Sequence, residues 1–123
     1  MIEGACLCGA VTFKVGAGAQ GYSVCHCGQC RKQSGHVWAS GYAPAANITI
    51  TGDVRWFEAS ETAKRGFCPI CGSSLFWKAH DEDTMSFALG AVDNPTGVTL
   101  EKHIFVGDKG DYYEIMDGLP QKP

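Results

Sequence analysis

The sequence predicts a mainly β fold built from short strands. Short runs rich in β-branched and aromatic residues recur along the chain, and turn-forming residues separate them. No segment shows the 3.6-residue periodicity of an amphipathic helix longer than about two turns. Sixteen glycines among 123 residues suit a loop-rich sheet assembly, and this length predicts one domain.

The first expected strand spans residues 10–15, where Val11, Phe13 and Val15 alternate with residues on the opposite face. A glycine-rich stretch then ends it. The same reasoning predicts six further strands, over residues 36–42, 47–51, 54–58, 74–78, 84–89 and 98–106. Two short helices could form, over residues 28–34 and 112–117. We expect one domain over residues 1–119 and a flexible tail over residues 120–123.

Seven cysteines are the main chemical feature of the sequence, and they occur as Cys6-x-Cys8, Cys25-x-Cys27-x-x-Cys30 and Cys68-x-x-Cys71. A disulfide framework is the alternative to metal binding, but it usually requires an even count and an oxidising compartment. The count is odd, and the first residues lack the basic and apolar segments of a secretory signal. The pattern therefore favours thiolate metal ligands and a cytoplasmic location.

The cysteines divide into two candidate zinc sites by their spacing. One loop can aim three sulfurs at one ion, because six residues span Cys25, Cys27 and Cys30. The two distant pairs are each incomplete, and together they supply the four thiolates of a closed structural site. This Cys₄ site consists of Cys6, Cys8, Cys68 and Cys71. Glycine follows Cys8, Cys27 and Cys71, where a tight turn can point backbone N–H groups at sulfur.

The three-cysteine site would keep one metal position open. Three thiolates donate much charge to zinc, so a soft fourth ligand such as a substrate sulfur is favoured over water. A thiol held there would lose its proton and become nucleophilic. The alternative is that His26, His36 or a distant side chain completes the site, which would then be structural.

The charge pattern argues against a nucleic-acid partner. The formal net charge is −3, and the ten basic residues are scattered along the chain. Seven metal-bound thiolates would make the chain more negative still. No apolar stretch approaches the roughly 20 residues of a membrane helix, so no membrane partner is expected.

The chain resembles the glutathione-dependent formaldehyde-activating enzyme family, also called the Gfa or centromere-protein-V family, over nearly its whole length. Six segments carry the resemblance: Gly4-Ala5-Cys6-Leu7-Cys8-Gly9-Ala10-Val11, Cys25-His26-Cys27-Gly28-Gln29-Cys30-Arg31-Lys32-Gln33-Ser34-Gly35, Arg65-Gly66-Phe67-Cys68-Pro69-Ile70-Cys71-Gly72, Gly90-Ala91-Val92-Asp93, Lys102-His103-Ile104-Phe105-Val106 and Asp117-Gly118-Leu119-Pro120. It implies a mainly β, Mss4-like fold whose short-stranded sheets are pinned by a Cys₄ zinc site. It also implies two Zn²⁺ ions per chain, a structural ion on Cys6, Cys8, Cys68 and Cys71 and a labile catalytic ion on Cys25, Cys27 and Cys30.

The activity implied by the resemblance is that of a carbon-sulfur lyase, which forms or cleaves S-hydroxymethylglutathione. Glutathione would be the co-substrate, and the partners would be a small-molecule thiol and an aldehyde. The alternative is a noncatalytic zinc-binding adaptor module of Mss4-like fold. A weaker alternative is sulfoxide reduction by an active cysteine, which other proteins of this fold perform.

Several residues near the cysteines have two interpretations each. Arg31, Lys32, Lys64 and Arg65 could bind the carboxylates of glutathione or offset the thiolate charge. His36 could shuttle protons but is better explained as a polar residue at a strand start, and a structural hydrogen bond is expected for His103. Strand aromatics are expected in the core or a pocket wall, namely Trp38, Trp56, Phe57, Phe76, Trp77 and Phe87.

Overall fold

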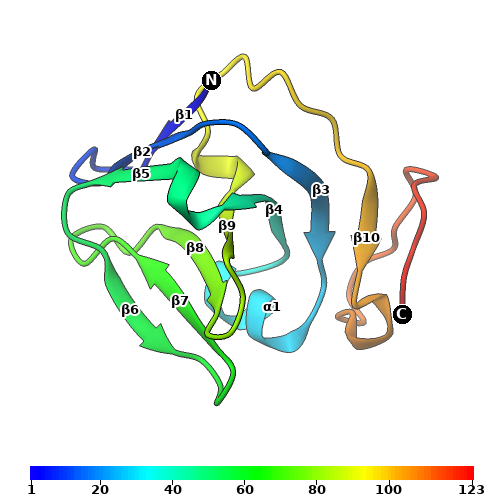
Figure 1. Cartoon of the computed structure of the whole chain (residues 1–123). Coiled ribbons are helices and arrows are strands. Elements are labelled where there is room, and N and C mark those ends of the chain that lie inside the picture. Colours follow the sequence, from blue (N-terminus) through cyan, green and yellow to red (C-terminus); the bar gives the residue numbers. More distant parts are fainter.

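The computed structural model describes residues 1–123, which form ten short strands in two sheets (Figure 1). The smaller sheet has three strands in the order β1 (Ile2–Ala5), β2 (Thr12–Val15) and β5 (Ile48–Thr51). The larger sheet has seven, in the order β10 (Lys102–Ile104), β3 (Gln20–Cys25), β4 (Trp38–Pro44), β9 (Thr84–Ala88), β8 (Ser74–Ala79), β7 (Ala63–Phe67) and β6 (Arg55–Glu58). All neighbours are antiparallel except β10 and β3. The expected mainly β fold is confirmed.

The core lies where the smaller sheet packs on the larger one. Phe13 of β2 contacts Phe76 of β8 edge-on, with ring centroids 5.3 Å apart, and also lies near Phe87 of β9. All three rings are buried. Because side chains alternate along a strand, the residues next to Phe87 face away from this core. The opposite face of the larger sheet is therefore free to form a site.

One α-helix, α1 (Gly28–Ser34), confirms the expected helix over residues 28–34. The Cys27 sulfur caps its start by accepting a hydrogen bond from the Cys30 N–H, and Gly35 ends it in the left-handed conformation. Three 3₁₀ turns complete the helical elements, η1 (Ala45–Asn47), η2 (Leu89–Ala91) and η3 (Val106–Asp108).

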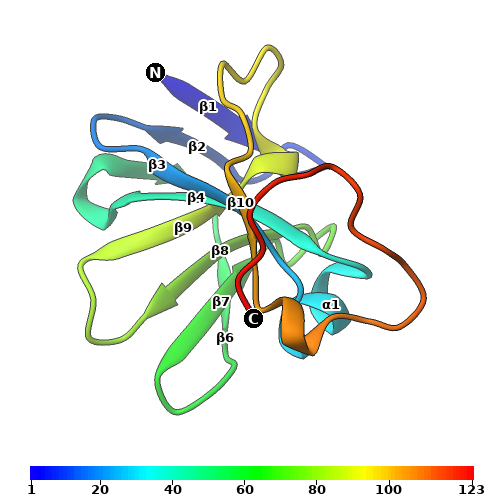
Figure 2. The ribbon, with the colours of Figure 1, turned by 90° about the vertical axis from the view of Figure 1, so that its right-hand side faces the viewer.

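The C-terminal segment differs from the expectation. The helix expected over residues 112–117 is not formed, because this stretch runs along β10 and α1 and its tyrosines hydrogen-bond with histidines. Figure 2 shows the end of the chain, in red, returning beside β10. The Lys122 N–H donates to the His103 carbonyl, and the His103 N–H donates to the Pro120 carbonyl. Residues 120–123, expected as a flexible tail, thus contribute backbone hydrogen bonds to β10.

Three observed strands, β1, β3 and β7, were not predicted, and each contains glycine. Gly4 lies opposite Phe13 and Gly66 lies opposite Trp56 across their sheets. A Cβ at Gly66 would lie 2.9 Å from the Trp56 ring. These glycines give space to aromatic rings on the neighbouring strand, a role that a sequence does not reveal.

We expect Gly4→Ala to lower the free energy of unfolding by about 1–3 kcal/mol, the usual cost of overpacking a core. The added methyl group would overlap the Phe13 ring and lie 2.6 Å from the Ala91 carbonyl oxygen. Gly90→Ala is the matched control, because a Cβ there meets no atom within 4 Å. Chemical denaturation measures both, and an equal effect of the two changes would contradict the packing account.

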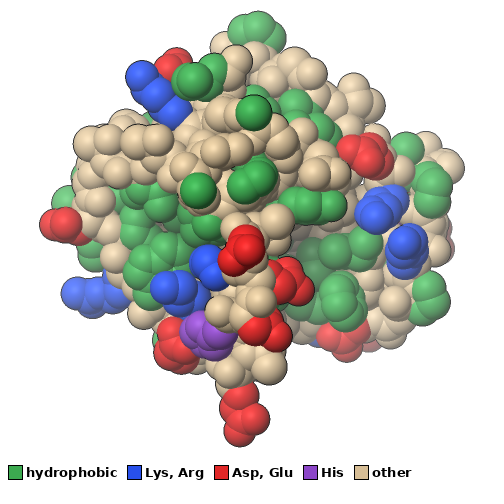
Figure 3. Space-filling view, viewed as in Figure 1, with side chains coloured by type: hydrophobic (Ala, Val, Ile, Leu, Met, Phe, Trp, Pro, Cys, Tyr) green, Lys and Arg blue, Asp and Glu red, His purple; other side chains and the backbone are tan.

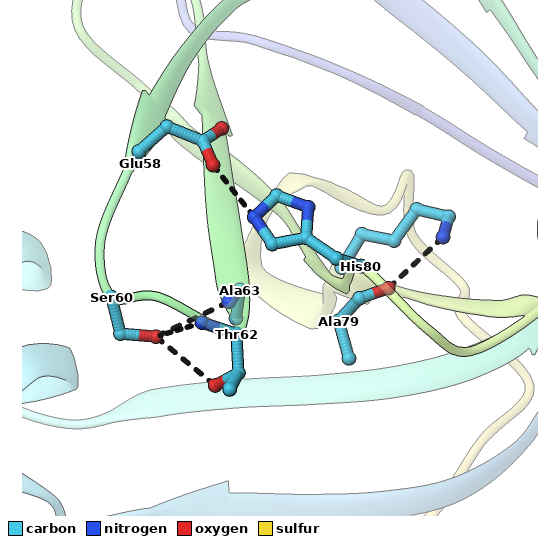
Figure 4. A network of polar contacts seen from close by, with 7 residues as sticks. Glu58, Ser60, Thr62, Ala63, Ala79 and His80 are labelled. Atoms are coloured by element: carbon cyan, nitrogen blue, oxygen red, sulfur yellow. Dashed lines mark hydrogen bonds and ion pairs between the residues drawn. The ribbon is translucent and has the colours of Figure 1, made fainter.

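The hairpin of β6 and β7 is fastened to the turn after β8 (Figure 4). The His80 Nε2 and Glu58 Oε1 atoms lie 2.6 Å apart. Within the hairpin turn, the Ser60 hydroxyl accepts hydrogen bonds from the N–H groups of Thr62 and Ala63. These contacts hold a hairpin whose β7 strand carries Arg65 toward the three-cysteine cluster.

Candidate metal centres and an adjoining cavity

The structure gathers the seven cysteines into the two groups that the sequence predicts, and all seven are free thiols. The first group joins Cys6 and Cys8, which follow β1, to Cys68 and Cys71, which follow β7. Its four Sγ atoms lie within 4.8 Å of one another, with Cys6–Cys8 at 3.6 Å and Cys8–Cys68 at 3.7 Å. Tetrahedral zinc with bonds of about 2.3 Å separates its sulfur ligands by about 3.8 Å. This donor set therefore fits zinc.

Hydrogen bonds from backbone and hydroxyl groups reach three of the four sulfurs in this four-cysteine cluster. The Val11 N–H donates to the Cys6 sulfur at 3.3 Å, and the Ile70 N–H donates to the Cys68 sulfur at 3.4 Å. The Ser73 hydroxyl lies 3.1 Å from the Cys71 sulfur, and its hydrogen bond lowers the pKa of Cys71 to about 5. Metal binding requires deprotonated thiols, so these contacts favour it.

The second group lies where β3 meets α1. Cys25 ends β3, Cys27 caps α1 and Cys30 lies buried within the helix. Their Sγ atoms also lie within 4.8 Å of one another. Three converging thiols fit a zinc ion that keeps one position for another ligand.

Arg65 is the cation that contacts this three-cysteine cluster. Its buried guanidinium donates to the Cys30 sulfur at 3.4 Å and also to the side chains of Gln29 and Gln33. The pKa of Cys30 is lowered to about 5 by a hydrogen bond from Cys25 and by Arg65, against the effect of burial. The same contact and burial raise the pKa of Cys25. The guanidinium thus offsets thiolate charge.

The other three flanking cations have different surroundings. Arg31 donates to the backbone oxygens of His26 and Asp108, and the Lys64 ammonium lies over the Trp56 ring. Lys32 is exposed on α1. Of the two roles considered for the four cations, the structure supports charge compensation for Arg65.

We expect Arg65→Met to weaken metal binding at the three-cysteine cluster by about 10–100-fold, the usual effect of losing a group that supports a metal ligand. Arg55→Met is the matched control, because Arg55 is exposed on the same hairpin. Competition with a chromophoric chelator measures the affinity. Equal affinities in the two variants would show that the Arg65 contact does not support the metal.

A cavity of about 390 Å³ reaches the three-cysteine cluster. Cys25, Cys27 and Cys30 all line it, together with the indole rings of Trp38 and Trp77. No residue of the four-cysteine cluster lines this cavity. All three cysteines of this cluster therefore adjoin the cavity, whereas a separate pocket of about 600 Å³ meets the four-cysteine cluster at Cys71.

His26 belongs to a hydrogen-bonded chain outside the cavity. Its Nδ1 lies 2.5 Å from the Tyr113 hydroxyl, and its Nε2 lies 2.8 Å from His103 Nδ1. His103 Nε2 in turn lies 2.8 Å from Asp117 Oδ2. If both rings are neutral, the Tyr113 hydroxyl donates to His26 Nδ1, His26 Nε2–H donates to His103 Nδ1, and His103 Nε2–H donates to Asp117. Burial is the largest cause that lowers the pKa of His26.

These contacts bear on the alternative in which a histidine completes the three-cysteine cluster. Both ring nitrogens of His26 are already engaged, and His36 Nδ1 lies 2.8 Å from the Tyr112 hydroxyl. Neither histidine joins the three sulfurs in a group with metal-ligand spacing. The hydrogen bonds expected for His103 are present.

The expected placement of the aromatic residues is largely confirmed. Phe76 and Phe87 lie in the core, Trp56 packs against it, and Trp38 and Trp77 line the cavity. Phe57 is largely exposed on β6.

Sequence reasoning missed the polar residues of the cavity, Ser23, Ser40, Ser86 and Lys102. A usable signal was present, because Ser23 lies two residues before Cys25 on one strand and so shares its face.

The fold and its clusters define a small β protein with two candidate metal centres, one of which lines a cavity with all three of its cysteines. The chain belongs to the glutathione-dependent formaldehyde-activating enzyme family, whose model matches residues 1–108. It is similar to an uncharacterized lyase of Schizosaccharomyces pombe, with 27% identity over 94% of this chain and 85% of the yeast protein. Family and relative together indicate an enzyme of the lyase type.

A solved structure shares the fold. A crystal structure of a Rhodobacter sphaeroides protein superimposes with a TM-score of 0.57 and 23% identity, covering 79% of this chain and 90% of that one. No helix of the present chain has the length and apolar character needed to cross a membrane.

Proposed function

We propose that this protein is a zinc-dependent carbon-sulfur lyase that forms or cleaves S-hydroxymethylglutathione or a related thiol-carbonyl adduct. The reaction would take place at Cys25, Cys27 and Cys30. The observation that carries the proposal is that these three sulfurs converge and line a cavity of about 390 Å³. Family membership supplies the reaction class.

The proposed reaction needs no oxidant or reductant. A carbon-sulfur bond forms between the thiol sulfur and the carbonyl carbon, and the proton lost from sulfur ends on the carbonyl oxygen. Zinc on the three thiolates would supply a soft position where a substrate thiol is held deprotonated. Arg65 offsets part of the charge that gathers on the sulfurs, because its guanidinium contacts Cys30. Trp38 and Trp77 supply large apolar surfaces to the same cavity.

The remaining parts of the proposal concern cofactors, partners and compartment. Two Zn²⁺ ions per chain are proposed, a structural ion on the four-cysteine cluster and a labile catalytic ion on the other. Glutathione would be the co-substrate, and a cytoplasmic location would keep the seven thiols reduced. On the face drawn in Figure 3, the basic side chains lie singly or in small groups with acidic side chains nearby, and the lack of a broad basic patch there supports small molecules rather than nucleic acid as partners.

The test measures exchange between glutathione, formaldehyde and their adduct by two-dimensional NMR, which separates catalysis from the spontaneous reaction. The zinc-loaded protein should accelerate exchange in proportion to its concentration. A variant of the four-cysteine cluster such as Cys8→Ser is unsuitable as a control, because it is expected to disturb folding. Lys14→Gln, on the smaller sheet, is a suitable one and should retain full acceleration. Exchange at the spontaneous rate with fully loaded protein would contradict the proposed activity on this adduct.

The alternative, a noncatalytic zinc-binding adaptor module, is favoured by one observation. Leu7 and Ile70 are 90% and 75% exposed, and each lies between two cysteines of the four-cysteine cluster. Exposed apolar side chains on loops that a metal ion would hold together suit protein contacts. The exchange experiment distinguishes the two functions, because an adaptor would leave the rate unchanged.

A further inference from the structure

One face of the larger sheet forms the floor of the cavity beside the three-cysteine cluster. Across the strands, Lys102 lies opposite Ser23 and Ile104 opposite Cys25. On the other side of β3, Ser40 of β4 lies opposite Ser23. All five residues line the cavity, as expected for positions on one face. The three-cysteine cluster and Lys102 thus lie on the same wall of the cavity, where one ligand can contact both.

This floor presents hydrogen-bonding groups that have no protein partner. Ser23 is 6% exposed, and its hydroxyl forms no hydrogen bond with another protein group, nor do the hydroxyls of Ser40 and Ser86. These three serines line the cavity, so their hydroxyls are free to form hydrogen bonds with a polar ligand.

The cavity also contains one uncommitted positive charge. Lys102 forms no ion pair, whereas the other lining cation, Arg65, contacts Cys30, Gln29 and Gln33. No aspartate or glutamate lines the cavity. A half-buried lysine without a counter-charge favours an anionic ligand, and the serine hydroxyls that line the same cavity add donors for carboxylate oxygens.

From these observations we propose a carboxylate-binding subsite formed by Lys102 with Ser23 and Ser40, so that the substrate carries a carboxylate near its reacting centre. Lys102 lies two residues before Ile104, the neighbour of Cys25, and two residues of a strand span about 6.6 Å. This separation suits a carboxylate a few bonds from the sulfur or the carbonyl carbon. The identity of the reacting group, a thiol or a carbonyl, rests on the proposed function. The contact between Lys102 and a carboxylate does not depend on that function.

The test compares equilibrium binding of 3-mercaptopropionate and its uncharged amide, 3-mercaptopropanamide, to the zinc-loaded protein by isothermal titration calorimetry. Lys102→Gln should weaken binding of the acid by about 10–100-fold, as expected for loss of a charge-assisted hydrogen bond, and leave the amide within about twofold. Lys102→Arg should retain the preference for the acid. Lys14→Gln removes the same charge from the smaller sheet and should change neither ligand.

Titrations with a second class of ligand, an aldehyde, identify which reactant carries the carboxylate. If the thiol carries it, the acid and the amide respond differently to Lys102→Gln. If the carbonyl compound carries it, Lys102→Gln instead weakens binding of glyoxylate, an aldehyde with a carboxylate, and leaves both thiols unchanged. The subsite is overturned if Lys102→Gln weakens acid and amide equally, or leaves the acid and glyoxylate unaffected. Selective binding without any accelerated adduct exchange would overturn the lyase proposal and leave the subsite standing.

Discussion

Cys68→Ser is expected to abolish stable folding of the chain. Cys68 is fully buried, and its cluster joins the loop after β1 to the loop after β7. Structural zinc sites contribute about 10–16 kcal/mol of apparent binding free energy, whereas whole domains are stable by only about 5–15 kcal/mol. Loss of one of the four zinc ligands is therefore expected to remove stabilisation comparable to the whole free energy of unfolding of the domain.

The measurement is soluble yield together with circular dichroism and zinc content. Cys68→Ser should give little soluble protein, and the soluble fraction should lack cooperative unfolding. Wild-type protein stripped of metal by a strong chelator should behave in the same way. A Cys68→Ser variant that unfolds cooperatively near the wild-type midpoint would contradict a structural role for the four-cysteine cluster.

Cys27→Ser is expected to leave the fold intact and to remove both the second zinc ion and catalysis. Cys27 caps α1 by accepting a hydrogen bond from the Cys30 N–H, and serine is among the best residues for that position. The substitution therefore preserves the helix start while it removes one of three thiolates. Adduct exchange should fall to the spontaneous rate.

Cys27→Ala serves as the comparison, because it removes the thiolate and the helix cap together. It should lose the same zinc ion and also about 0.5–2 kcal/mol of stability. Zinc content and denaturant unfolding measure the two effects separately. If Cys27→Ser loses folding as completely as Cys68→Ser, the three-cysteine cluster is structural and the proposed division of roles is wrong.

The grouping of the cysteines could be predicted because it depends mostly on reach along the chain. Three cysteines within six residues can converge without help, and the two distant pairs then have each other as partners. The α1 helix was predictable for a similar reason, since its cap and its terminating Gly35 are local. Such features need no knowledge of the rest of the fold.

Features that depend on neighbouring strands could not be predicted in this way. The strand β1 contains Gly4, and a glycine weakens the sequence pattern of a strand. Only the structure shows that the Phe13 ring on the neighbouring strand fills the space beside Gly4. The segment 112–117 forms hydrogen bonds with histidines far away in the sequence instead of a helix. The subsite around Lys102 likewise depends on the parallel pairing of β10 with β3.

We propose that the protein holds two unequal zinc sites, one closed and one open to a thiol. The most direct test is zinc release to a chromophoric chelator, measured with and without excess glutathione. We predict two zinc ions per chain that leave in two separate phases, with glutathione changing only the fast phase and Cys27→Ser lacking that phase. Release of both ions in one phase that glutathione does not affect would show that the two sites are equivalent and that neither is open to a thiol.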